Sequence, residues 1–136
     1  MDRVFIDTNY FIRLIIGEPL DQNRKANKLF REGALSNIQL FTTAIVVFEI
    51  YWVLSSFYKK DKKQISSVLI DILRMNFIDI ENRDILLSAV KTYCTTSLDL
   101  EDSYNLCFAR SKKANIFATF DKRLCKISGR KFSNTP

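Results

Sequence analysis

The sequence has no histidine among its 136 residues, and only three glycines, two prolines and three cysteines. Without a histidine base, hydrolytic chemistry in this chain should be led by a metal ion. The low glycine and proline counts argue against a loop-rich or disordered protein. Cys94, Cys107 and Cys125 are widely spaced and form no CxxC pair, which argues against a zinc site or a disulfide framework and indicates buried thiols in a reducing compartment.

Long apolar runs are absent as well, since none reaches the ~18 residues of a membrane-spanning helix. We therefore expect no membrane association. The first three residues lead directly into a predicted strand, which leaves no room for a signal peptide, so a cytoplasmic location is expected. The length favours one domain over residues 1–136, and a hydrophobic content of 47% supports a real core.

Hydrophobic periodicity and breaker residues predict strands separated by helices or helix pairs. Strands are expected at residues 3–6, 39–42, 77–80 and 116–119, with a possible edge strand at 131–136. Helices are expected at residues 9–16, 20–32, 44–58, 61–74, 83–95 and 100–113. Gly33 should end the second helix, and Asp121 should open a short last one. This order predicts a three-layer α/β fold with a mostly parallel sheet of four to five strands flanked by helices.

Two predicted strands lead into an aspartate, the first into Asp7 and the fourth into Asp121. Ligands of open α/β sheets bind at the carboxyl edge of the strands, so the two acids suggest a shared site. Each could instead cap the helix that follows, although Asn9 could take that task from Asp7. Thr119 lies two residues before Asp121 and would project to the same side of a strand, with its hydroxyl beside the carboxylate.

Residues 44–54 are all apolar except Glu49. A charge in such a segment is costly unless it is paired or holds a metal ion. A salt bridge is the alternative, but no basic residue lies one helical turn away on either side. A partner for Glu49 would therefore come from elsewhere in the fold.

Asp99, Glu101 and Asp102 lie together at the start of a predicted helix. The helix dipole favours acids there, so this cluster also has a purely structural explanation. The residues alone do not say which of the three points into a site. Asp102 shares a helix face with Leu106 and Ala109, and this face should pack inward.

Carboxylates converging from four segments would need neutralisation, and Mg²⁺ and Mn²⁺ prefer carboxylate and water oxygens as ligands. The chain also has a net charge of +6. Between residues 110 and 131 there is one acid, Asp121, among the basic residues Arg110, Lys112, Lys113, Lys122, Arg123, Lys126, Arg130 and Lys131. Such basic residues could neutralise the phosphates of a polyanion partner. Alternatively, they could form a basic surface that only contacts solvent.

The chain resembles the PIN-domain ribonucleases, in particular toxins of the VapBC type, in an ordered set of residues: Asp7-Thr8-Asn9, then Glu49 in a hydrophobic helix after Thr42-Thr43, then Asp102 and Thr119-Phe120-Asp121. The resemblance spans essentially the whole chain. It implies a Rossmann-like sheet of about five parallel strands and Mg²⁺- or Mn²⁺-dependent cleavage of single-stranded RNA. It also implies a homodimer and, for a toxin, a small antitoxin protein whose tail blocks the site.

The resemblance further implies roles for individual residues. The metal-site acids would be Asp7, Glu49, Asp102 and Asp121, supported by Thr8, Asn9, Asp99 and Thr119. We expect the RNA to contact basic residues of the C-terminal part, namely Arg110, Lys112, Lys113, Lys122 and Arg123. The chain departs from the family after the third acid, where Ser103 and Tyr104 replace a small apolar residue and a leucine, so packing there should be atypical.

Three rival functions remain open at this point. An RNA-processing nuclease without a toxin role fits the same residues. A phosphoacceptor signalling domain also combines strand-end acids with Mg²⁺, but it needs a tight acidic pair after the first strand, where this chain has Asp7-Thr8-Asn9. A catalytically silent RNA-binding protein would not need the four acids.

Overall fold

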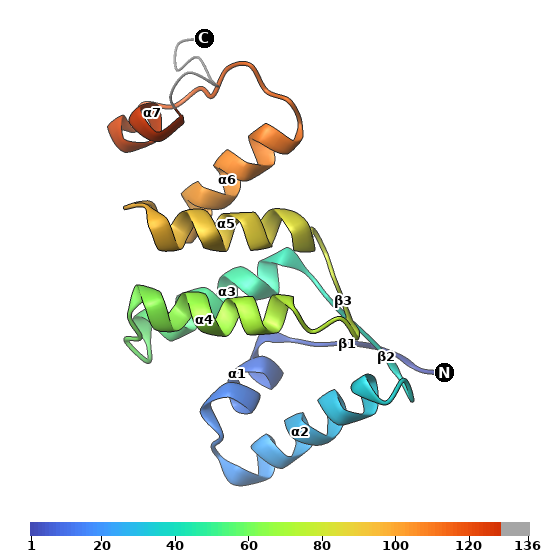
Figure 1. Cartoon of the computed structure of the whole chain (residues 1–136). Helices are drawn as coiled ribbons and strands as arrows, with labels where there is room; N and C mark the ends of the chain where they lie inside the picture. Colours follow the sequence, from blue (N-terminus) through green and yellow to red (C-terminus); the bar gives the residue numbers. More distant parts are fainter. Residues whose placement is uncertain (129–136) are drawn as a thin grey trace. The chain divides into compact units, whose positions relative to one another are not determined.

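The computed structural model describes residues 1–128 of the chain (Figure 1). The chain divides into two compact units, Met1–Arg83 and Asp84–Pro136. The edge strand expected at residues 131–136 lies outside the described residues. Over residues 1–128, no helix is long and apolar enough to cross a bilayer.

The first unit is built on a parallel sheet of three strands in the order β1-β2-β3. These are β1 (Arg3–Phe5), β2 (Gln39–Thr42) and β3 (Ile78–Ile80). In the register, Val4 aligns with Leu40 and Leu40 with Ile78. Parallel neighbours require crossover connections, and each crossover here is a helix pair: α1 (Thr8–Ile16) with α2 (Leu20–Ala34), then α3 (Ala44–Ser56) with α4 (Lys62–Leu73).

The helices of the first unit pack on one another as well as on the sheet. Helix α1 contacts α2 and α3, and α3 contacts α4. Figure 1 shows α1 and α2 in blue and α3 and α4 in teal to green. Between α1 and α2, the rings of Phe11 and Phe30 meet edge to face with centroids 5.3 Å apart. On the strands, Leu40 and Ile78 are buried while Asp79 is exposed. The hydrophobic core of this unit therefore lies between one face of the sheet and the helices.

The second unit is helical in its described part. Helix α5 (Arg83–Thr95) is followed by α6 (Leu100–Ser111) and α7 (Lys122–Ser128). Its core includes a cluster of Leu98, Leu106 and Leu124. The short helix expected after Asp121 is confirmed as α7, and the helix start expected near residue 100 is confirmed as α6.

The strand predicted at residues 116–119 is wrong. In the described part of the chain this segment contains only an isolated bridge residue, Ile116, and the sheet has three strands, not four to five. A strand needs hydrogen bonds to a neighbour along its length, whereas here Phe117 packs against the leucine cluster of the second unit and Phe120 is fully exposed. The apolar character of this segment, which suggested a strand, is thus explained in part by the packing of Phe117 on the leucine cluster.

Gly33 does not end α2, which continues to Ala34. Gly33 is buried, and a Cβ atom placed on it would overlap the side chain of Leu40 on β2. The glycine therefore allows α2 to approach the sheet closely. Helix termination by glycine is seen instead at Gly17, whose φ of 84° closes α1 and lets its N–H donate to the carbonyl of Arg13.

Replacing Gly33 with valine should destabilise the protein by at least about 2 kcal/mol, because three new carbon atoms would be forced against buried Leu40. Ala34→Val is the matched control, since Ala34 is the exposed next residue of the same helix turn and its replacement should cost less than about 1 kcal/mol. Chemical denaturation of both variants measures the difference. Equal stabilities would show that the close approach does not need glycine.

Candidate functional site

Asp7 lies two residues after the end of β1 and opens α1. Its backbone is extended, and its Oδ1 accepts a hydrogen bond from the backbone N–H of Thr8 at 2.8 Å. The capping role considered from the sequence therefore belongs to Asp7 and not to Asn9. Only one carboxylate oxygen is used for it, and the Asp7 side chain is exposed. Its Oδ2 has no hydrogen-bond or ion-pair partner among residues 1–128, so it can serve as a ligand.

Thr8 joins Asp7 to Glu49. The Thr8 side chain is buried, and its Oγ1 donates to Oε2 of Glu49 at 2.9 Å. The same threonine thus gives its backbone N–H to one predicted acid and its hydroxyl to another. Two of the four predicted acids, from α3 and from the start of α1, are brought to one corner of the first unit by this residue.

The expectation that Glu49 is buried among apolar residues is wrong. Glu49 is exposed, and its neighbours one turn away on α3, Ile45 and Trp52, are 68% and 61% exposed. Helix α3 buries its other side, with Val47 and Ile50 fully enclosed. Because almost every residue of α3 is apolar, the sequence did not reveal which side of this helix faces the solvent. The salt-bridge alternative also fails for the described residues, because none of their cations pairs with Glu49.

Two further residues at the carboxyl edge of the sheet, Thr42 and Glu81, were not among the predicted site residues. Thr42, buried at the end of β2, donates its hydroxyl to the carbonyl of Ile6 at 2.8 Å and so fixes the chain just before Asp7. Glu81, just after β3, accepts the backbone N–H of Ala44 at 3.1 Å and caps α3. A signal was present for Glu81, since it is an acid just after a predicted strand, as Asp7 is.

In the second unit, the start of α6 is organised by Asp99. Its Oδ1 accepts the backbone N–H of Asp102 at 2.8 Å, and its carbonyl accepts the hydroxyl of Ser103 at 2.7 Å. This explains the departure from the family pattern, because the buried Ser103 hydroxyl has a backbone acceptor. Tyr104, the second unusual residue, stacks on Phe108 with ring centroids 6.0 Å apart.

Asp121 caps α7, which was the structural alternative to a ligand role considered from the sequence. Its Oδ1 accepts the backbone N–H groups of Arg123 at 2.8 Å and Leu124 at 3.1 Å. These bonds, the one from Leu124 foremost, lower the pKa of the Asp121 carboxyl. Thr119 does place its hydroxyl close by, accepting the backbone N–H of Asp121 at 3.0 Å, but through a turn and not through a strand.

Asp102 lies within electrostatic range of the other acids of this unit. Burial is the main cause that raises its pKa, and the negative charges of Asp99 and Asp121 raise it further, while Arg123 opposes them. The stability contributed by Asp102 is thus present at low pH and is lost as the pH rises through the raised pKa. For Asp121 the sign is opposite, and its contribution is lost as the pH falls through the lowered pKa. A cation near these groups would favour ionised Asp102.

The basic residues predicted to contact RNA have mixed surroundings. The guanidinium of Arg123 lies 3.7 Å from Oδ2 of Asp121 and donates to the carbonyl of Ser97. The ammonium group of Lys112 lies 5.6 Å from the centroid of the Phe108 ring. Lys113 and Lys122 are exposed. Their role in RNA binding stays a prediction.

The acids are the right ligand type for Mg²⁺ or Mn²⁺, since hard cations prefer carboxylate and hydroxyl oxygens. Among residues 1–128, however, no three histidine, cysteine or acidic residues come close enough to hold a metal ion. Within the first unit, Thr8 joins Asp7 to Glu49 through hydrogen bonds. Within the second unit, Asp102 and Asp121 lie within electrostatic range of each other. A single metal site formed by all four acids stays a prediction.

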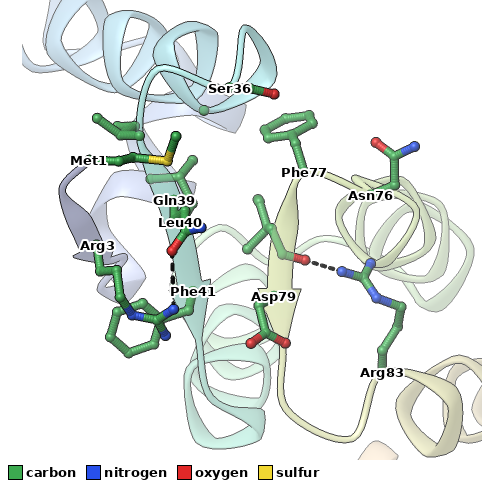
Figure 2. Close-up of a pocket in the computed structure, with 13 residues that line it drawn as sticks. Met1, Arg3, Ser36, Gln39, Leu40, Phe41, Asn76, Phe77, Asp79 and Arg83 are labelled. Carbon is green, nitrogen blue, oxygen red and sulfur yellow. Dashed lines mark hydrogen bonds between the residues drawn. The ribbon is translucent and has the colours of Figure 1, made fainter.

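A hollow of about 570 Å³ on the first unit is a separate feature (Figure 2). Figure 2 shows Arg3 beside Phe41 and Gln39 on one side and Arg83 on the other. The guanidinium of Arg83 donates to the carbonyl of Ile78. None of the predicted metal-site acids lines it. The chemistry of the acids, and not the size of the hollow, therefore locates the candidate site.

Asp99→Asn should lower the pKa of Asp102, because it removes one of the negative charges that raise it while the asparagine oxygen can still cap α6. Carboxyl NMR titration of the variant measures this shift. Asp84→Asn, at the start of α5, is the control and should leave Asp102 unchanged. An unaltered Asp102 titration in Asp99→Asn would contradict the proposed electrostatic coupling.

Comparison with protein families finds a match to the PIN domain over residues 4–130. The match includes all four predicted acids and residues of both units. A search of curated proteins finds no match. PIN domains are generally metal-dependent nucleases with a parallel sheet flanked by helices, and this α/β class is the one that the sequence predicted. With the match covering nearly the whole sequence, the chain belongs to the PIN-domain family.

Proposed function

We propose that this protein is a metal-dependent endoribonuclease that hydrolyses phosphodiester bonds in RNA, with Mg²⁺ or Mn²⁺ as its cofactor. The proposed metal ligands are Asp7 and Glu49 of the first unit and Asp102 and Asp121 of the second. The observation that carries the proposal is the Asp7–Thr8–Glu49 arrangement at the carboxyl edge of a parallel sheet in a PIN-family chain.

Thr8 would act as a positioning residue in this site. Its two hydrogen bonds engage Oδ1 of Asp7 and Oε2 of Glu49, which leaves the second oxygen of each carboxylate for a cation. In the second unit, Asp99 would orient the start of α6, and Thr119 would orient the backbone at Asp121. A bound divalent cation lowers the pKa of water and stabilises charge on a phosphoryl group.

The raised pKa of Asp102 fits a ligand role. Its surroundings make the ionised carboxylate costly when no cation is near, and a divalent cation would offset that cost. The lowered pKa of Asp121 keeps that carboxylate ionised to lower pH. The two carboxyls thus differ in how readily they ionise before a cation binds.

The resemblance to VapBC-type toxins extends the proposal to a toxin role, a homodimer and a small antitoxin partner. The alternative is a PIN-domain nuclease that processes RNA without a toxin role. A neighbouring reading frame for a small DNA-binding protein would favour the toxin, and its absence would favour RNA processing. Basic residues of the C-terminal part, Arg110, Lys112, Lys113, Lys122 and Arg123, are proposed to contact RNA phosphates in either case.

Asp7→Asn should reduce Mg²⁺-dependent RNA cleavage by about 100-fold or more, because an amide cannot supply the anionic oxygen that the metal ion requires. The fold should persist, since asparagine also caps helices. The measurement is digestion of total cellular RNA with and without EDTA, followed by mapping of the new RNA ends.

Asp71→Asn is the matched control, because Asp71 is an exposed aspartate on α4 outside the candidate site. This variant should cleave like the wild type. Wild-type cleavage by purified Asp7→Asn, or cleavage that persists in EDTA, would refute the assignment.

A double-mutant cycle tests whether acids of both units bind the same metal ion. If Asp7 and Asp102 share one Mn²⁺, then Asp7→Asn and Asp102→Asn should each weaken Mn²⁺ binding, and the double variant should lose much less than the sum of the two effects. Isothermal titration calorimetry measures the three affinities. Additive losses would place the two acids in independent sites, and unchanged Mn²⁺ affinity in both single variants would exclude them as ligands.

A further inference from the structure

A second hollow of the first unit lies between α1 and α2, and its lining includes residues of the first turns of α1, the helix that Asp7 opens. It has a volume of about 310 Å³ and is lined by Asn9, Tyr10, Arg13, Gln22 and Lys25. Its lining begins two residues after Asp7 in the sequence. With a helical rise of about 1.5 Å per residue, Tyr10 lies roughly 4.5 Å and Arg13 roughly 9 Å along α1 from Asp7. A ligand in this hollow would therefore lie within about 10 Å, measured along α1, of the helix end that carries Asp7.

The lining carries positive charge without an acid to cancel it. It contains Arg13 and Lys25 and no aspartate or glutamate. Among residues 1–128, neither cation has an ion-pair partner. By contrast, the hollow on the sheet face includes Asp79, and a third hollow, between α5 and α6, includes Asp84. A fourth hollow, with Lys60 and Lys63 in its lining, also has no acid, but it has no aromatic residue either. Of these four, the hollow between α1 and α2 is the one that combines two cations and an aromatic ring without an acid.

Arg13 is held in place by neutral partners. Its Nε donates to Oε1 of Gln22 at 2.7 Å, and its carbonyl accepts the side-chain amide of Asn23 at 2.8 Å. These bonds tie α1 to α2 without using the terminal nitrogen atoms of the guanidinium. An arginine positioned in this way loses little freedom when it binds a phosphate.

The remaining lining groups suit a nucleotide better than a bare anion. Tyr10 is 40% exposed, and an aromatic ring of this kind can stack on a base. Asn9 and Gln22 carry amides that can donate to and accept from base edges or sugar hydroxyls. Single-stranded RNA is recognised through this combination of stacking, side-chain polar groups and cationic contacts to phosphate.

We propose that the hollow between α1 and α2 is a subsite for one nucleotide of single-stranded RNA. Arg13 and Lys25 bind its phosphate, and Tyr10 stacks on its base. This inference rests on the proposed nuclease function and extends it, because it places an RNA contact on the first unit beside Asp7. The RNA contacts expected from the sequence all lie in the second unit.

The test is the fluorescence anisotropy of a labelled single-stranded RNA at several KCl concentrations, in EDTA so that cleavage does not interfere. Arg13→Ala and Lys25→Ala should each weaken binding and reduce the slope of log affinity against log salt by about 0.7, the value for one lost phosphate contact on a single strand. Arg24→Ala, an exposed cation of α2 outside the lining, is the matched control and should keep the wild-type slope.

Tyr10 gives an independent measurement. Tyr10→Ala should weaken RNA binding by about 5- to 100-fold through lost stacking, while Tyr10→Phe should retain most of the affinity. If Arg13→Ala unfolds, Arg13→Lys replaces it and should keep the salt slope while weakening binding. Wild-type affinities and slopes in folded Arg13, Lys25 and Tyr10 variants would overturn the subsite.

Failure of the subsite and failure of the nuclease function are distinguishable. If the wild type cleaves RNA, Asp7→Asn does not, and the hollow variants bind RNA normally, then only the subsite is wrong. If the hollow variants lose RNA binding but the wild type shows no metal-dependent cleavage, then the hollow is confirmed as an RNA site and the nuclease proposal is wrong.

Discussion

The hydroxyl of Thr8 is the contact on which the candidate site depends. By donating to Glu49 while its backbone N–H bonds Asp7, Thr8 fixes two carboxylates that come from different crossovers of the sheet. The hydrogen bond of Thr42 to the carbonyl of Ile6 adds to this by holding the end of β1 against β2. The corner of the first unit that holds Asp7 and Glu49 is thus stabilised by two buried threonines, whose short side chains supply hydroxyls without adding charge.

Much of the first unit could be predicted from the sequence because its local signals agree with its packing. The three strands and four helices appear close to their expected positions, and breakers such as Gly17 mark a true helix end. The wrong predictions arose where the same residue type can have two structural roles. Gly33 serves close packing inside a helix, and Phe117 packs on helices instead of joining a sheet. Neither use can be read from local periodicity, because each depends on which distant residue lies opposite.

Some residues of the candidate site were selected by arguments that the structure does not support. Asp7, Asp99 and Asp121 all cap helices, so the capping explanation and the ligand explanation are not exclusive, since a carboxylate has two oxygens. Glu49 was selected because a buried charge would be costly, yet it is exposed. Its place in the site rests on its bond to Thr8, which links residues 41 positions apart and could not be inferred from a single sequence. Glu81 was overlooked although the sequence around it resembles that around Asp7.

The cap that Glu81 provides for α3 affects how a polyanion can approach this edge. Helix N-termini normally attract phosphates through their free N–H groups, but at α3 those of Ala44 and Val46 are already bonded by Glu81 and Thr43, and at α1 that of Thr8 is bonded by Asp7. The edge therefore presents carboxylates where other α/β proteins present an anion-binding dipole. The carboxylates would weaken the binding of RNA phosphates at this edge when no cation is bound, so cation and nucleic acid should bind with positive cooperativity, each strengthening the affinity of the other.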